Sequence, residues 1–170
     1  ASNMEIGSNY LTDRARSFVE TGDLKYLNDF FEEVEVVKRR DNALNDLESQ
    51  LKDNSGGAYR YLAEALNLSN TLLEQEYLAM RLKLESMDAD MGSVPEVLRT
   101  LQLDRKYDTY TKEELAAEAR SLMFNDRYLD YKERIKDNVD KSTRELIATA
   151  GAELDVEQEY STLVAEMNQL

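Results

Sequence analysis

Several residue types are absent from this chain of 170 residues or nearly so, and each absence excludes a class of site. There is no cysteine, so disulfide bonds and thiolate metal ligands are excluded. There is no histidine either, which removes the usual general base, a common metal ligand and the ordinary side chain for sensing pH near neutrality. A Ser-His-Asp triad and a di-iron site built on Glu-x-x-His are therefore impossible. We expect no enzyme activity and no cofactor.

Turn-forming residues and long apolar runs are scarce as well. The chain has one proline and six glycines, which suits long helices better than many short strands. It contains no apolar run of about 18 residues, so no segment is predicted to span a membrane. The 35 acidic and 21 basic residues give a net charge of −14, which repels nucleic-acid phosphates and anionic membrane surfaces. Neither is expected as a direct partner.

Apolar residues recur at helical spacing along most of the chain, which predicts an all-α fold. The pattern stops at a turn where Gly22 can adopt a positive φ and Asp23 can cap the next helix. Capping boxes at 93–96 and 111–114 predict two further helix starts. We expect one domain, an antiparallel four-helix bundle over 1–170 with a long C-terminal helix. Its main helices are expected at 4–22, 24–52, 58–87 and 111–170, with a capping insert at 88–110.

The most regular pattern lies in the last helix, from about residue 127 to residue 170. Apolar residues alternate there by threes and fours, which is typical of a coiled-coil seam. A continuous helix of this length would be roughly 65 Å long, so its end is expected to extend past the bundle and to need a partner. Asn125-Asp126 is expected to kink or interrupt the helix before this seam. The chain ends inside the pattern and begins with Ala1-Ser2-Asn3, so we expect a fragment of a longer protein.

Charged residues inside the apolar stripes are candidates for ligand binding. An unpaired buried charge costs several kcal/mol, so each buried one must pair with another residue or with a ligand. An arginine in such a place is suited to a ligand carboxylate, and a tyrosine can line the rim of a small-molecule pocket. An internal ion pair, an exposed flank or a tyrosine at the core edge remain open as alternatives. The candidates are Arg16, Arg40, Glu76, Tyr77 and Arg81.

The segment from Arg16 to Leu27, with its Thr-Gly-Asp turn, resembles the start of extracytoplasmic four-helix sensing domains of bacteria. These include CHASE-type domains and the ligand-binding regions of chemoreceptors. Four further stretches resemble sensors that are joined to diguanylate cyclases and histidine kinases. They lie at 30–33, 39–44, 76–81 and 123–128. The resemblance covers most of the chain, and the Thr-Gly-Asp turn is its distinctive motif. The insert is longer than a minimal bundle needs, so no ligand of the family is carried over.

The resemblance implies a module between two flanking membrane helices, extracytoplasmic and homodimeric, that senses a small molecule or a partner. Its long last helix would pass a shift to a cytoplasmic output domain. Polar residues in the seam are expected to weaken its packing and to make a second helix position accessible; these are Ser142, Thr149 and Glu153. The residues alone also allow another function, that of a cytoplasmic helical adaptor or coiled-coil interaction protein without catalytic activity.

Overall fold

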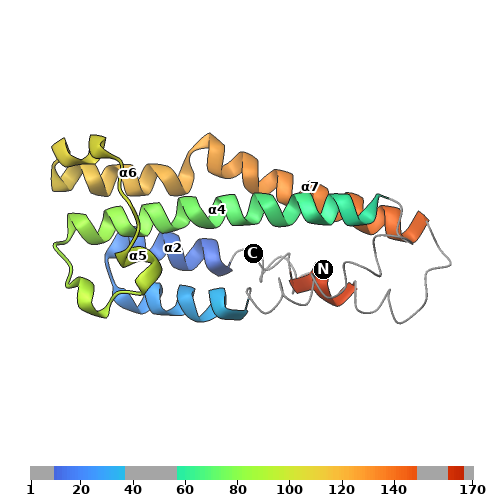
Figure 1. Ribbon diagram of the computed structural model, residues 1–170, viewed down its shortest axis with the longest axis horizontal. Helices are drawn as coiled ribbons and strands as arrows, with labels where there is room; N and C mark the ends of the chain where they lie inside the picture. Colours follow the sequence, from blue (N-terminus) through green and yellow to red (C-terminus); the bar gives the residue numbers. More distant parts are fainter. Residues whose placement is uncertain (1–9, 37–56, 149–160, 167–170) are drawn as a thin grey trace.

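The computed structural model describes residues 10–36, 57–148 and 161–166 (Figure 1). Every regular element in these ranges is a helix, so the predicted all-α class is confirmed. The elements are α2 (Tyr10–Thr21), a helical segment at 24–36, α4 (Ala58–Ser86), the 3₁₀ helix η1 (Met91–Ser93), α5 (Glu96–Arg99), the 3₁₀ helix η2 (Arg105–Thr109), α6 (Lys112–Phe124), α7 (Asp126–Ala148) and a helical segment at 161–166.

The central element is α4, which contacts α2, α5, α6 and α7. Figure 1 shows α6 and α7 following one another along one side of α4, antiparallel to it. The hairpin of α2 and 24–36 lies along the other side of its C-terminal half. Met80 and Leu82 of α4 are both fully buried. Side chains two residues apart lie about 200° apart around the helix axis, so these two point to nearly opposite sides of α4. The sequence of α4 is therefore apolar on more than one face, which allows partners on opposite sides.

The buried apolar side chains of the described residues form two clusters. The larger one, called here the large core, joins α2, 24–36, the C-terminal half of α4, α5, α6 and the start of α7. Its largest fully buried side chains include Phe18, Phe30, Leu98 and Tyr128. The small core lies at the other end of α4 and consists of Ala58, Leu62, Ala65, Val139, Leu163 and Val164. The large core contains the site described below.

The turn between α2 and 24–36 has the chemistry that its sequence predicts. Gly22 has a φ of +70°, and its N–H donates to the carbonyl of Phe18 at 2.7 Å. The Asp23 carboxylate accepts a hydrogen bond from the N–H of Lys25 at 3.0 Å. Both expectations, a positive φ at the glycine and a cap from the aspartate, are confirmed.

The Gly22→Ala variant is expected to lose about 1–2 kcal/mol of unfolding free energy, because a side chain is unfavourable at positive φ. A Cβ at this position would also lie 2.8 Å from the sulfur of Met87. Urea unfolding followed by circular dichroism measures the loss. Gly92→Ala is the control, because no positive φ occurs there and a change within about 0.5 kcal/mol is expected. An unchanged midpoint for Gly22→Ala would contradict the strain argument.

The insert between α4 and α6 differs from its prediction at one end and agrees at the other. The predicted capping box at 93–96 is wrong, because α5 follows Pro95 without a side-chain cap. The box at 111–114 is confirmed, since Thr111 and Glu114 exchange both hydrogen bonds. Val94, Leu98 and Tyr107 are buried in the large core. The insert is therefore part of the packed structure at this end.

The last predicted helix differs most from the structure. It is interrupted as Asn125-Asp126 indicated, with α6 ending at Phe124 and α7 beginning at Asp126. A single straight helix would separate Val139 from Leu163 by about 36 Å, yet both belong to the small core. One continuous helix over 111–170 is therefore wrong. The expected extension past the bundle is also wrong for 161–166, which packs against the start of α4.

Parts of other predictions fall outside the described residues. These are Arg40, Thr149, Glu153, the predicted start at residue 4 and the predicted helix end at residue 52. Ser142 lies within them and is fully buried, and its hydroxyl donates to the carbonyl of Ala58 at 2.7 Å. This polar seam residue therefore joins α7 to α4. Among the described residues, no helix combines the length and the apolar character needed to cross a membrane.

Candidate functional site

The candidate site lies where α6 ends and α7 begins, visible as a bend in Figure 1. We call residues 121–128 the α6–α7 joint. The N–H of Asn125 donates to the carbonyl of Ser121 at 2.8 Å and ends α6. The side-chain oxygen of Asn125 accepts from the N–H of Tyr128 at 2.8 Å, as an N-cap does. One asparagine thus ends the first helix and begins the second.

The last carbonyls of α6 are bound by side chains from other helices. A helix leaves its final carbonyls without partners inside the helix. Arg16 of α2 donates to the carbonyl of Met123 through Nε at 3.1 Å and Nη2 at 3.0 Å. Gln75 of α4 donates to the carbonyl of Leu122 at 2.8 Å and to the side-chain oxygen of Asn125 at 3.3 Å. The joint is therefore held by α2 and α4.

Arg16 also packs against the rings on both sides of the joint. Its guanidinium carbon lies 4.1 Å from the ring centre of Phe124 and 5.5 Å from that of Tyr128. A guanidinium within about 6 Å of an aromatic ring is attracted by the ring's negative face. Phe124 belongs to α6 and Tyr128 to α7, so one side chain of α2 contacts both helices.

A buried chain of hydrogen bonds lies beside the joint. The hydroxyl of Tyr128 is 2.8 Å from that of Thr12 in α2 and donates to Oε1 of Glu76 in α4 at 3.1 Å. Tyr128 is 0% exposed, Glu76 is 3% exposed and Thr12 is 4% exposed. The other carboxylate oxygen, Glu76 Oε2, is buried without a hydrogen-bond partner. Such an oxygen is costly in the ionised state, because water no longer solvates it.

Burial changes the acid–base properties of this cluster. Desolvation raises the pKa of Glu76 to about 7, although the positive charges of Lys132 and Arg16 and the Tyr128 hydrogen bond act in the opposite direction. Burial, with the adjacent Glu76 carboxylate, raises the pKa of Tyr128 well above its ordinary value. Burial lowers the pKa of Lys132. A glutamate here therefore exchanges its proton near neutral pH.

The structure brings together two of the five predicted site residues. Arg16 and Glu76 act on the same cluster, and the Arg16 charge favours the ionised form of Glu76. Tyr77 faces another neighbour: its ring stacks on Phe31 with 5.6 Å between ring centres. Burial raises the pKa of Tyr77 to about 12. Tyr77 is thus an aromatic contact between α4 and 24–36.

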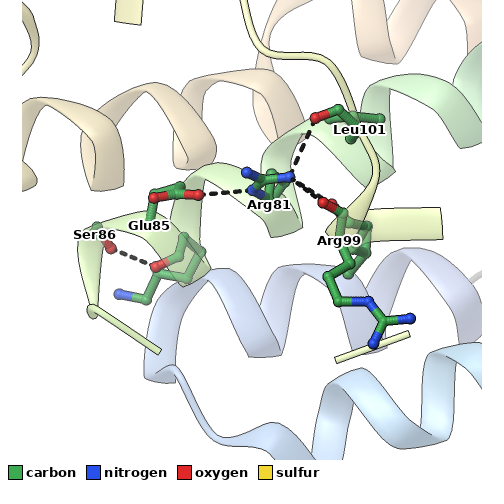
Figure 2. Close-up of polar contacts among 7 residues, drawn as sticks. Arg81, Glu85, Ser86, Arg99 and Leu101 are labelled. Atoms are coloured by element: carbon green, nitrogen blue, oxygen red, sulfur yellow. Dashed lines mark hydrogen bonds and ion pairs between the residues drawn. The ribbon is translucent and has the colours of Figure 1, made fainter. Parts of the chain in front are cut away.

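Arg81 binds the backbone of the insert (Figure 2). Its Nη1 donates to the carbonyls of Leu98 at 2.7 Å, Arg99 at 3.2 Å and Leu101 at 3.2 Å. Its Nε pairs with Glu85 at 2.8 Å, one turn further along α4. These partners occupy several of the donors of this guanidinium. Arg81 therefore binds carbonyls at the end of α5, away from the Arg16–Glu76 cluster.

Sequence reasoning missed several residues of the site. Thr12, Gln75 and Lys132 carry no distinguishing pattern in the sequence, and Tyr128 lies within the similar stretch at 123–128. Asn125 gave the one usable signal, because the Asn-Asp pair indicated an interruption of the helix. A helix break leaves carbonyls open, but the residues that bind them, Arg16 and Gln75, lie 107 and 47 residues away in the sequence.

The site consists of hydrogen bonds and ring contacts that join α2, α4, α6 and α7. The described residues contain no group of three or more acidic side chains placed to hold a metal ion. They do contain a helix junction whose carbonyls accept hydrogen bonds from Arg16 and Gln75 on two neighbouring helices. Beside this junction lies the carboxyl group of Glu76, whose Oε2 has no hydrogen-bond partner. No protein-family model, curated protein or solved structure matches the chain.

Proposed function

We propose that this chain is a sensing and relay domain without catalytic chemistry of its own, in which α7 changes position when α2 or α4 moves. The observation that supports this most directly is the binding of the joint's carbonyls by Arg16 and Gln75. Displacing either helix changes the hydrogen bonds that set the angle between α6 and α7. A ligand or partner that binds one arrangement better than the other shifts the population between them.

The domain is proposed to be an antiparallel four-helix bundle. The support is the antiparallel packing of α4 with α6 and α7 and the hairpin of α2 and 24–36 beside them. Helices of such a bundle that face one another supply the side chains of its internal sites. The Thr12–Tyr128–Glu76 chain, which joins three helices, is a site of this kind.

We further propose that the domain is the extracytoplasmic part of a bacterial membrane signalling protein, with a diguanylate cyclase or a histidine kinase as the favoured output, and that it works as a homodimer. The support is the sequence resemblance and the place of the similar stretches in the structure. The similar stretch at 16–27 begins with Arg16, that at 76–81 begins with Glu76, and that at 123–128 covers most of the joint. The resemblance therefore falls on the residues that hold α6 and α7 together.

A cytoplasmic helical adaptor remains the second candidate, and one observation favours it. Residues 161–166 pack into the small core, which removes the support for a long last helix that carries a shift out of the bundle to an output domain. The coding sequence on both sides of the chain distinguishes the two. Apolar segments of about 20 residues on each side would support the membrane sensor. Their absence would contradict it and leave the adaptor.

Distance measurements between spin labels test the relay, and the lack of native cysteine makes the labelling specific. Exposed positions are replaced in pairs: Asn70→Cys with Asp137→Cys reports on α4 and α7, and Asn70→Cys with Glu113→Cys reports on α4 and α6. Amino acids and organic acids are first screened for a saturable rise in Tm, since a ligand at 100 times its Kd adds about 2.7 kcal/mol. We expect a compound that raises Tm to change the α4–α7 distances while the α4–α6 distances stay the same.

Two variants give this experiment its control. Arg16→Met removes the hydrogen bonds to Met123 and is expected to reduce the change in α4–α7 distance. Arg120→Met, which loses only the exposed ion pair with Glu20, is expected to respond like the parent chain. A compound that binds and stabilises the chain without changing the α4–α7 distances would contradict the relay.

A further inference from the structure

The open oxygen of Glu76 is the feature that the relay alone does not explain. Oε1 accepts from Tyr128, but Oε2 has no partner although it is buried. Nearly all buried polar atoms in proteins form a hydrogen bond, so an exception needs a physical reason. A carboxyl group that spends part of its time protonated provides one, because its neutral form is far less costly to bury.

The hydroxyl chain beside Glu76 has two possible directions. When Glu76 is ionised it can only accept, so Tyr128 must donate to it and Thr12 must donate to Tyr128. When Glu76 is neutral it can donate to the oxygen of Tyr128, and Tyr128 then donates to Thr12. Both directions use the same contacts, of 2.8 Å and 3.1 Å. One proton on α4 thus determines the direction of hydrogen bonds that reach α7 and α2.

The charged and titratable groups that act on Glu76 come from two helices. Arg16 is on α2, and Tyr128 and Lys132 are on α7. No titratable side chain of α6 within the described residues acts on it. The two positive charges favour the ionised form, while burial opposes it more strongly. The balance places the proton exchange near neutral pH.

We propose that Glu76 of α4, beside the α6–α7 joint, binds and releases a proton, and that release of the proton loosens the contact between α7 and α4. The ionised carboxylate leaves Oε2 unsolvated between α4 and α7, so it favours arrangements in which water reaches this oxygen. The neutral carboxyl group favours the closed arrangement. This inference rests on the proposed relay, and it names one stimulus, the proton, to which that relay responds.

The first test compares the pH dependence of stability in three proteins. Glu76→Gln carries a neutral side chain of the same shape at all pH values. Glu74→Gln is the control, because Glu74 is an exposed glutamate on the same helix. The pKa of Glu76 is higher in the folded state than in the unfolded state. The stability that Glu76 contributes is therefore complete at pH values below the unfolded-state pKa, and it is lost as pH rises through the folded-state pKa. Stability conferred by Glu76 is therefore lost as pH rises from about 4.5 through about 7.

The expected result is a difference in unfolding equilibrium constants, measured by urea titration. Between about pH 5 and pH 8 the constant of the parent chain and of Glu74→Gln should rise by roughly a hundredfold more than that of Glu76→Gln. Equal pH profiles for the parent chain and Glu76→Gln would overturn the proposal. If Glu76→Gln does not fold, carbon NMR of the glutamate carboxyl groups in the parent chain decides instead. A glutamate titrating near neutral pH supports the proposal, and none doing so overturns it.

The second test asks whether the proton moves α7. The spin labels at Asn70→Cys and Asp137→Cys are measured at about pH 6 and pH 8 without any added compound. We expect the distance distribution to shift or broaden at the higher pH in the parent chain and in Glu74→Gln, and to stay unchanged in Glu76→Gln. A titration at Glu76 without any change of the α4–α7 distance would overturn the coupling. Because the compound screen is run at one fixed pH, failure of ligand-driven relay and failure of the proton response are seen separately.

Discussion

Replacing Arg81 by methionine is expected to lower the free energy of unfolding by about 2–4 kcal/mol, since hydrogen bonds from a charged group contribute about 1.5–3 kcal/mol each and do not add fully. The change leaves the carbonyls of Leu98, Arg99 and Leu101 without their shared donor. It also removes the pairing with Glu85. The side chain of Arg81 is only 15% exposed, so water replaces these bonds poorly. Urea unfolding measures the loss.

The Arg81 variants also distinguish a structural role of this arginine from a role in binding a ligand carboxylate. Arg81→Lys keeps the charge but lacks the planar group that reaches several acceptors at once, so it should recover only part of the loss. Hydrogen exchange should become faster at 96–101 in both variants. A residue that serves a ligand carboxylate would behave differently, because Arg81→Met would then leave stability nearly unchanged and abolish a ligand-induced rise in Tm.

The second large effect is expected at Tyr128. Tyr128→Ala should cost about 3–5 kcal/mol, because it removes a fully buried aromatic ring and leaves a cavity in the large core. Tyr128→Phe keeps the ring and removes only the hydroxyl between Thr12 and Glu76, so it should cost about 1–3 kcal/mol. The difference between the two variants measures packing, and the smaller loss measures the hydrogen-bond chain.

A double-mutant cycle checks that the hydroxyl acts through the carboxyl group. The loss caused by Tyr128→Phe should be larger at about pH 8, when Glu76 is mostly ionised, than at about pH 5. It should also be smaller in a Glu76→Gln background at the higher pH. Equal losses in both backgrounds and at both pH values would mean that the Tyr128 hydroxyl stabilises the chain independently of Glu76, through its contact with Thr12.

Local signals in the sequence predicted those features that depend on neighbouring residues. The Gly22 turn, the Asp23 cap, the capping box at 111–114 and the interruption at Asn125 each rest on contacts a few residues apart. The failed box at 93–96 has the same residue pattern, but α5 begins at Glu96 with Pro95 as its N-cap, so Ser93 lies two residues before the cap position, and its hydroxyl donates to the carbonyl of Asp90. A short motif thus predicts a helix start less well when a proline inside it can itself occupy the cap position.

The site could be predicted only in part because its contacts are distant in sequence. Thr12 and Tyr128 are 116 residues apart, and Glu76 and Tyr128 are 52 apart. Periodicity places Glu76 on an apolar stripe, but it does not tell which side chain of another helix meets it. The lack of histidine also suggested that no side chain titrates near neutral pH. Burial gives Glu76 that property, which composition cannot reveal.

The two ends of α4 belong to different cores and pack against different elements. The helix contributes to both, and its C-terminal half packs in the large core with α2, 24–36, α5, α6 and the start of α7. Among the described residues, its first turns pack with α7 and 161–166 in the small core. Free energies of local opening follow the amount of apolar surface that an opening exposes. Among the described residues the small core has fewer buried side chains than the large core, so we expect its backbone amides to exchange faster than those of the large core. Because α7 contributes Ile135 to the large core and Val139 to the small core, a shift of α7 at the joint would also move the part of this helix that packs in the small core.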